Sequence, residues 1–321
     1  MGVTGKTKPL LALCLVILVV FTAGCTDGNG SKPIVADVIN IPENTYIVHN
    51  MEPYAGGTTT IEFFVVNDGR DKLDSVEIKF YELGGFTVID LKCWAPADIR
   101  INSEKTDASC VFDDMISSDK RKVVLTLQAP STEKIKSDTS IPVKYYVKYD
   151  FIGHRQAILP LVDDVTMTQP PKPYEPSSPS DGPVVLEFEP PKAGQVKQGS
   201  QTVTLSWAKK DVPFEMKMNF KIAGSSNLGV VQPVNISAGD VSIKLIGLSI
   251  ATVAGKEVAC DFAGSDTVTS KEEVQVPGTL SCNFVSSKTD FVGYYNTQLE
   301  AAFKYTYEIR REETFTVKSS K

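Results

Sequence analysis

The stretch TTTIEFFVVNDGRDKLDSVEIKFYE, Thr58–Glu82, decides the fold class. Apolar and polar residues alternate on both sides of its centre, which is typical of strands that bury one face and expose the other. The polar run Asn67–Lys72 between the two alternating segments has the composition of a turn. The stretch therefore predicts two consecutive β-strands.

The same alternation continues along the rest of the chain. It is found at residues 122–130, 142–151, 201–208, 216–224, 240–248, 278–285 and 301–309. No segment carries a 3.6-residue apolar stripe over ten or more positions, as an amphipathic helix would. The sequence therefore predicts an all-β protein in which each half packs two antiparallel sheets as an immunoglobulin-like sandwich.

A proline-rich segment, QPPKPYEPSSPSDGP at 169–183, separates the two halves. Such a composition favours extended polyproline II structure and acts as a semi-rigid spacer. We expect a first sandwich domain at 34–168, a linker at 169–183 and a second sandwich domain at 184–321.

The N-terminus has the layout of an export signal. Lys6 and Lys8 precede an apolar run at 10–21, which is shorter than the roughly 20 residues of a spanning helix. Thr22-Ala23-Gly24-Cys25 then resembles the lipobox of lipoproteins. This resemblance implies a signal peptide at 1–24, a two-chain lipid on Cys25, a polar tether at 25–33 and anchoring to the outer face of the cell membrane. A conventional signal peptide with an unmodified Cys25 is the alternative.

Cysteine usage fits the same compartment. Apart from Cys14 in the signal and Cys25, the chain has Cys93, Cys110, Cys260 and Cys282, two in each half. We expect disulfides between Cys93 and Cys110 and between Cys260 and Cys282, although four cysteines allow three pairings. Each bridge closes a loop of about 20 residues and stabilises the fold by roughly 3 kcal/mol.

The two halves show signs of an internal repeat. Val147–Phe151 aligns with Phe303–Tyr307 at an offset of 156, and the same offset places His154-Arg155 on Arg310-Arg311. The shared pattern is an aromatic strand, a basic segment and an apolar segment. We interpret it as a terminal hairpin with a basic turn, repeated in a duplicated sandwich.

The stretch 60–82 also resembles the opening of CARDB-like immunoglobulin-type domains, which occur in repeated form on archaeal cell-surface proteins. A strand that ends in Val-Asn-Asp-Gly, a polar turn and a second alternating strand carry this resemblance, together with the aromatic terminal strand at 142–151. It covers about 130 residues of the first half. The resemblance implies a fold more than a function, since such sandwiches host many activities.

Catalytic signatures are scarce. The chain has two histidines, His49 and His154, and none of the nucleophile, zinc-protease or nucleotide-binding motifs. A calcium site is a possible interpretation of the three carboxylates Asp68, Asp71 and Asp74. Their spacing lacks the EF-hand pattern, however, and fits a polar turn. We therefore expect no catalytic residue, no metal and no cofactor. With 39 acidic against 33 basic side chains, the net charge of −6 argues against a nucleic-acid partner.

Surface positions can be assigned from the alternation. Along 143–151 the odd residues share the core face, which leaves Tyr146 as the exposed aromatic. Trp94 follows Cys93 in a loop-like context, so Trp94 and Tyr146 are the candidate partner surface. Asn29 and Asn235 begin Asn-X-Ser triplets and are possible glycosylation sites.

Three functions are compatible with these features. The first is a non-catalytic, lipid-anchored surface protein that binds an unknown protein or glycan or builds the envelope. The second is a carbohydrate-binding module that uses Trp94 and Tyr146. The third is an unrecognised hydrolase, for which the paired carboxylates Asp113-Asp114 and Asp163-Asp164 are the local candidates. Neighbouring residues on one strand point to opposite faces, so neither pair alone could flank a bond, and we interpret both as solvated loop residues.

Overall fold

The structure of the 321-residue chain is a computed structural model. The described residues are 39–40, 47–49, 51–94, 96–163, 174–180, 182–192, 194–198, 201–222, 230–231, 234–253, 256–257 and 259–319. Within them, 39–40, 47–49, 194–198, 201–205, 230–231, 253 and 256–257 are described by their backbone alone. The predicted signal at 1–24, Cys25 and Asn29 lie outside these ranges.

The described residues up to 163 form nine strands. They are β1 (Ile39–Asn40), β2 (Ile47–His49), β3 (Thr58–Asn67), β4 (Leu73–Tyr81), β5 (Thr87–Trp94), β6 (Ala97–Ile101), β7 (Ala108–Met115), β8 (Lys120–Gln128) and β9 (Thr139–Val162). The strands β3 and β4 are the two consecutive strands that the stretch Thr58–Glu82 predicts.

The described residues after 173 continue the strand-rich pattern. They form β10 (Glu175–Pro176), β11 (Val184–Glu189), β12 (Gly194–Gln198), β13 (Gln201–Leu205), β14 (Ala208–Lys209), β15 (Phe214–Ile222), β16 (Val230–Val231), β17 (Val234–Ile236), β18 (Val241–Ile246), β19 (Leu248–Ile250), β20 (Thr252–Val253), β21 (Lys256–Glu257), β22 (Phe262–Gly264), β23 (Thr267–Ser270), β24 (Val274–Val276), β25 (Gly278–Ser286) and β26 (Tyr294–Val317). The predicted all-β class is confirmed. No helix of the described residues is long and apolar enough to cross a membrane.

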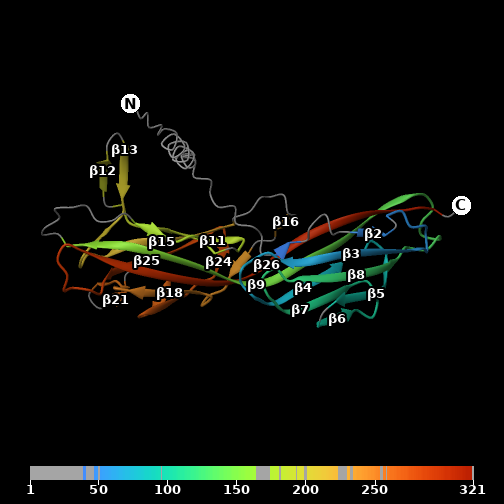
Figure 1. Cartoon of the computed structure of the whole chain (residues 1–321), viewed down its shortest axis with the longest axis horizontal. Coiled ribbons are helices and arrows are strands. Elements are labelled where there is room, and N and C mark those ends of the chain that lie inside the picture. The colour runs from blue at the N-terminus through green and yellow to red at the C-terminus, as the bar shows by residue number, and fades with distance from the viewer. Residues whose placement is uncertain are drawn as a thin grey trace, which may run out of the picture. The chain divides into compact units, whose positions relative to one another are not determined.

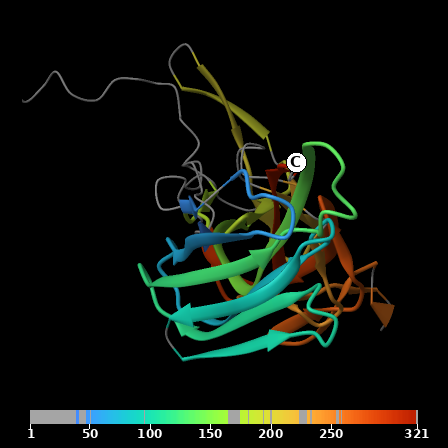
Figure 2. The same ribbon diagram turned by 90° about the vertical axis from the view of Figure 1, so that its right-hand side faces the viewer.

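The first sandwich packs two antiparallel sheets. One has the strand order β1-β3-β8-β5, and the other contains β9-β4-β7-β6. Aromatic rings join the sheets in the core, where Phe63 of β3 lies 5.6 Å from Phe80 of β4 and 5.5 Å from Tyr145 of β9. Figure 2 looks at this sandwich from the end that carries the label C in Figure 1.

The second sandwich repeats this order. Its first sheet is β11-β15-β25-β19, and its second contains β26-β18-β23-β22. Phe220 of β15 and Phe303 of β26 meet edge to face across the core, 5.5 Å apart. Each strand of these four sheets therefore has a counterpart in the other half, at the same place in its sheet and in the same order along the chain.

The two halves share one continuous sheet because β9 and β26 pair with each other over their whole length (Figure 1). The antiparallel register runs from Tyr294 opposite Val162 to Val317 opposite Thr139. Each strand has 24 residues. The predicted terminal hairpin is therefore wrong: His154-Arg155 and Arg310-Arg311 lie within continuous strands, since the alternation of buried and exposed residues continues on both sides of them.

Strand pairing crosses the domain boundary expected at 169–183. The first half of β9 pairs with β4 and the first half of β26 pairs with β18, so the second half of each strand extends into the other sandwich. The second half of β26 thus completes the first sandwich. Phe315 is fully buried there, 5.6 Å from the ring of Phe86.

Part of the proline-rich segment also joins this sheet. Glu175 and Pro176 form β10 and pair with β9 opposite Ile158 and Ala157. The backbone N–H of Ser177 donates to the carbonyl of Gln156 over 2.8 Å. The second half of β26 also has a free edge, and there β16 pairs with β26 at Arg310 and Ile309. These short strands cover edges that would otherwise expose unpaired backbone groups.

Candidate functional site

The alternation along β9 separates a core face from an outer face. Its odd residues from Val143 to Phe151 are buried, as predicted, and Tyr145 stacks on Phe63 inside the sandwich. Tyr146 points the opposite way and is half-buried on the outer face of the shared sheet. The outer face of β4, β7, β9 and β26 is the candidate interaction surface.

A groove of about 400 Å³ runs across this surface. It is lined by Ser75, Glu77, Arg100, Val111, Lys148, Tyr149, Asp150 and Thr306. These residues come from five different strands, β4, β6, β7, β9 and β26, so only the sheet topology brings them together. The groove offers carboxylates, cationic groups and a hydroxyl side by side, which suits a polar ligand.

Tyr146 and Tyr81 form an aromatic pair next to the groove. Their ring centroids lie 5.7 Å apart, and the Tyr146 hydroxyl donates to Oε2 of Glu77 over 3.1 Å. Partial burial raises the pKa of Tyr146, and the negative charge of Glu77 raises it further. The tyrosine therefore stays a neutral donor, and its hydrogen bond fixes the Glu77 carboxylate at the groove.

Arg100 forms the outer wall of the groove. Its Nε and Nη2 donate to Oδ2 of Asp98, over 2.9 and 2.6 Å. These hydrogen bonds and the charge of Asp98 raise the pKa of the guanidinium. A second depression begins at Arg100 and Glu77 and continues along β6 and β7 to Asp107.

Trp94 lies on a different surface from Tyr146. It is the last residue of β5, opposite Lys122 of β8, so it belongs to a strand and not to a loop as its sequence context suggests. The side chain is 50% exposed, and the Lys122 ammonium lies 5.1 Å from its ring centroid. Since β5 and β9 belong to opposite sheets of the sandwich, the structure does not bring the two predicted aromatics into one site.

Each sandwich contains one disulfide. Cys93 of β5 is bonded to Cys110 of β7, with 6.4 Å between their Cα atoms. Cys260, which precedes β22, is bonded to Cys282 of β25, with a Cα separation of 4.0 Å. The pairing expected from the sequence is the one present.

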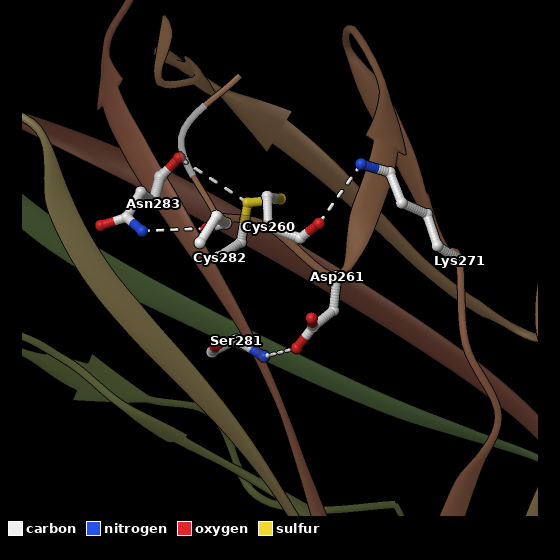
Figure 3. The surroundings of a disulfide bond; sticks show 7 residues. Cys260, Asp261, Lys271, Ser281, Cys282 and Asn283 are labelled. Carbon is white, nitrogen blue, oxygen red and sulfur yellow. Dashed lines mark hydrogen bonds between the residues drawn. A yellow bond between two sulfur atoms is a disulfide. The ribbon is translucent and has the colours of Figure 1, made fainter. Parts of the chain in front are cut away.

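Polar contacts surround the second disulfide (Figure 3). The Asp261 carboxylate accepts a hydrogen bond from the backbone N–H of Ser281 over 2.6 Å. The Lys271 ammonium donates a hydrogen bond to the carbonyl of Cys260 over 3.3 Å. Nδ2 of Asn283 donates one to the carbonyl of Ala259 over 2.9 Å. The hydrogen bonds of Asp261 and Asn283, together with the bridge, hold residues 259–261 against β25.

The acidic turn between β3 and β4 has a structural explanation. The Asn67 side chain donates to the carbonyls of Asp71 and Met115, over 2.9 and 3.0 Å, and accepts from the N–H of Gly69. Lys72 lies 3.4 Å from a carboxylate oxygen of Asp74. Within the described ranges no three metal-ligating side chains gather.

The remaining predicted positions are dispersed. Asn235 is exposed in β17, so its side chain is accessible. Asp114 contacts Lys72 over 2.6 Å at the edge of the first sandwich, and Asp164 lies outside the described residues. Asp113 and Asp114 are exposed in β7, whereas Asp163 follows the end of β9 and donates its backbone N–H to the carbonyl of Gly293, so the described carboxylates of the hydrolase hypothesis do not share a site.

Sequence reasoning missed Arg100 and the groove, and it also missed a half-buried cation, Arg155. Arg155 is on the core face of β9, and its Nε and Nη1 are buried with no hydrogen-bond partner among the described residues. Burial lowers the pKa of this guanidinium, and burial also raises the pKa of the neighbouring Tyr174 to about 12. If the period-2 alternation had been extended from residues 143–151 to residue 155, it would have placed Arg155 on the core face.

No family model and no curated protein matches the sequence. Among solved structures, a variant of BcpA, the major pilin subunit of Bacillus cereus, is 10% identical with a TM-score of 0.29, covering 80% of this chain and 58% of the pilin. The major pilin SpaD of Corynebacterium diphtheriae is 8% identical with a TM-score of 0.27, covering 76% and 51%. The chain thus spans little more than half the length of these pilins. TM-scores of this size do not establish a common fold, so the fold class rests on the strand pairing.

Proposed function

We propose that the protein is a non-catalytic, lipid-anchored extracytoplasmic surface protein that acts as a binding, adhesion or envelope-structural module. The observation that carries the proposal is the pair of disulfides, one in each sandwich. Disulfides persist in oxidising compartments and are rare in the cytosol of most organisms. This agrees with the export-type N-terminus.

The candidate interaction surface supports a binding role. Glu77 accepts a hydrogen bond from the Tyr146 hydroxyl, and Asp150 accepts one from the Thr306 hydroxyl. Carboxylates that are held in place by such hydrogen bonds can orient a polar ligand. The partner we propose is therefore a surface protein or a glycan that contacts the groove beside Tyr146.

The anchor is tested by intact mass and membrane partitioning of the natively expressed protein beside a Cys25→Ser variant. We expect the wild type to lose 24 residues, gain lipid mass and partition with the membrane, and the variant to be soluble. If both proteins carry an unmodified residue 25 and remain soluble, the lipid anchor is rejected and a free secreted protein replaces it.

A carbohydrate-binding module is the second candidate function, favoured by the Tyr81–Tyr146 pair next to a polar groove. Aromatic faces with adjacent hydrogen-bonding groups are suited to sugar rings. A glycan array separates the two candidates. Binding that is lost in Tyr146→Ala but retained in Trp94→Ala supports sugar binding at this surface, and an array with no bound glycan rejects it.

A further inference from the structure

The strand β6 is an uncovered edge of the shared sheet. It is the last strand in the order β26-β9-β4-β7-β6, and no other described strand pairs with it besides β7. Its residues are exposed apart from the half-buried Ala97, and Ile99 and Ile101 expose 44% and 41% of their surface. An exposed edge with apolar residues is a template for pairing with another strand.

The turn that follows β6 shows which backbone groups are free. The N–H of Asn102 donates to the carbonyl of Asp107 over 3.1 Å, so this pair is hydrogen-bonded. Hydrogen-bonded and non-hydrogen-bonded pairs alternate in an antiparallel ladder. Asp98 and Arg100 therefore direct their backbone groups toward β7, and Ala97, Ile99 and Ile101 direct theirs toward the open edge.

The sequence of this edge, Ala97-Asp98-Ile99-Arg100-Ile101, is complementary to itself. If two copies pair antiparallel with Ile99 opposite Ile99, each Asp98 lies opposite the second copy's Arg100. The outward groups of Ala97, Ile99 and Ile101 then form about six backbone hydrogen bonds between the copies. Asp98 and Arg100 fall at non-hydrogen-bonded pairs, where opposite side chains come closest.

We propose that β6 is a self-association edge and that its partner is the β6 strand of a second copy of this chain. The proposal goes beyond the function above, since it concerns assembly, and Arg100 is the residue that this edge shares with the groove. In this pairing the Asp98–Arg100 contact within each chain is extended by two contacts between chains on the outer face. On the other face, Ile99 lies opposite Ile99 of the second copy, and each Ile101 lies opposite Ala97.

The charges select a single register. A shift of two residues in one direction places Asp98 opposite Asp98, and a shift in the other direction places Arg100 opposite Arg100. Like charges directly opposite destabilise a sheet, and opposite charges stabilise it. A shift of one residue moves every side chain to the other face. The pairing centred on Ile99 is therefore the one that this strand favours.

A charge-exchange experiment tests the proposal. The full chain, with the Arg100→Asp variant and the Asp98→Arg variant, is examined by sedimentation equilibrium over a range of concentrations. We expect wild type to form a dimer and each variant to dissociate with at least a tenfold higher Kd. An equimolar mixture of the two variants restores dimers, because one edge then carries two acidic and the other two basic residues.

Two further variants make the result specific. Ile99→Pro removes an outward N–H without removing a β6–β7 hydrogen bond, and we expect it to abolish dimer formation. Lys221→Glu reverses a comparable exposed ion pair, with Glu187, in the second sandwich and leaves the dimer unchanged. Circular dichroism confirms that each variant is folded. A wild type that stays monomeric, or folded single variants that dimerise like wild type, overturns the proposal.

Discussion

At the scale of single residues, Gly153 shows how β9 and β26 come into contact. It lies opposite Phe303 in the ladder, and a Cβ atom at this position would lie closer than 3.0 Å to three atoms of the Phe303 ring. The ring has no free space to move, since it packs 5.5 Å from Phe220 and 5.9 Å from Tyr305. An aromatic ring that covers a glycine across a strand pair compensates for the missing side chain.

We predict that Gly153→Ala destabilises the protein by about 1–3 kcal/mol, because overpacking a filled core forces side chains from their preferred rotamers. Urea unfolding at equilibrium measures the effect. The Phe303→Leu variant and the double variant complete a cycle, in which we expect the alanine to cost less once the ring is removed. Equal costs in both backgrounds would contradict the steric explanation.

Tyr174 makes the stability of the folded protein depend on pH in the alkaline range. Burial raises its pKa from the ordinary 10.0 to about 12, and its hydroxyl donates to the carbonyl of Phe188 over 3.4 Å. The folded state therefore binds the phenolic proton more tightly than the unfolded state. Its contribution to stability is complete below pH 10.0 and is lost as the pH rises toward about 12.

We predict that the free energy of unfolding falls more steeply with alkaline pH in wild type than in Tyr174→Phe. Denaturant unfolding at about pH 8, pH 10 and pH 11 measures both slopes. The pKa values of Tyr145 and Tyr146 are also raised, chiefly by burial, so some dependence remains in the variant. Identical slopes would show that Tyr174 is not buried as described.

At the scale of elements, the second half of β26 belongs to the first sandwich. Phe315 and Val317 are fully buried in its core. The residues at the end of the strand are also hydrogen-bonded to the segment that precedes β3: the N–H of Thr316 donates to the carbonyl of Met51, and that of Lys318 to the carbonyl of Pro53. The last strand therefore closes the sandwich that the first strands begin.

We predict that Phe315→Ala destabilises the first sandwich by about 3–5 kcal/mol, the usual cost of removing a buried phenylalanine. Hydrogen exchange resolved by peptide should show the loss of protection in β3, β8 and β9, although the substitution lies more than 150 residues further along the chain. Thr314→Ala, at an exposed position of the same strand, is the control. Faster exchange confined to the second sandwich would contradict the strand assignment.

The sequence predicts most of these elements but not their partners. Alternation is a local property, so the strands around Phe63 and Phe80 and the core face of β9 could be assigned before the structure. The continuation of β9 through Gly153-His154-Arg155 could not, because a glycine with two basic residues also has the composition of a turn. The groove at Glu77 and Arg100 depends on strands that are adjacent in space and distant in sequence, which no local pattern encodes.

At the scale of the whole molecule, the described strands have an approximate two-fold arrangement. Asp150 lies opposite Thr306, at the centre of the β9–β26 pairing, and these residues differ by the 156 positions of the repeat found in the sequence. Two equivalent aromatic pairs flank this centre: Phe151 with Tyr305 and Tyr149 with Tyr307, each at 5.7 Å. The chain thus resembles a dimer in which two sandwiches exchange the ends of their last strands.

The exchange predicts that the two halves cannot separate when the chain between them is cut. We propose to place a protease site within residues 164–173, cleave the folded protein and follow it by size-exclusion chromatography. The two fragments should elute as one species and part only in denaturant, because 24 residue pairs of β9 and β26 hold them together. Two sandwiches connected only by a spacer would separate at once.

Reassociation of the two fragments after denaturation tests whether the residues at the centre of the β9–β26 pairing select the partner. In a homodimer of the first fragment Asp150 would face a second Asp150, whereas in the native pairing it accepts a hydrogen bond from Thr306. The fragments should therefore recombine as a heterodimer. Thr306→Asp places two like charges opposite each other in the native register, and it should weaken recombination by about 0.2–1 kcal/mol. Thr306→Ser keeps the hydroxyl donor, so it should recombine like wild type. Equal recombination of all three proteins would show that the centre does not select the partner.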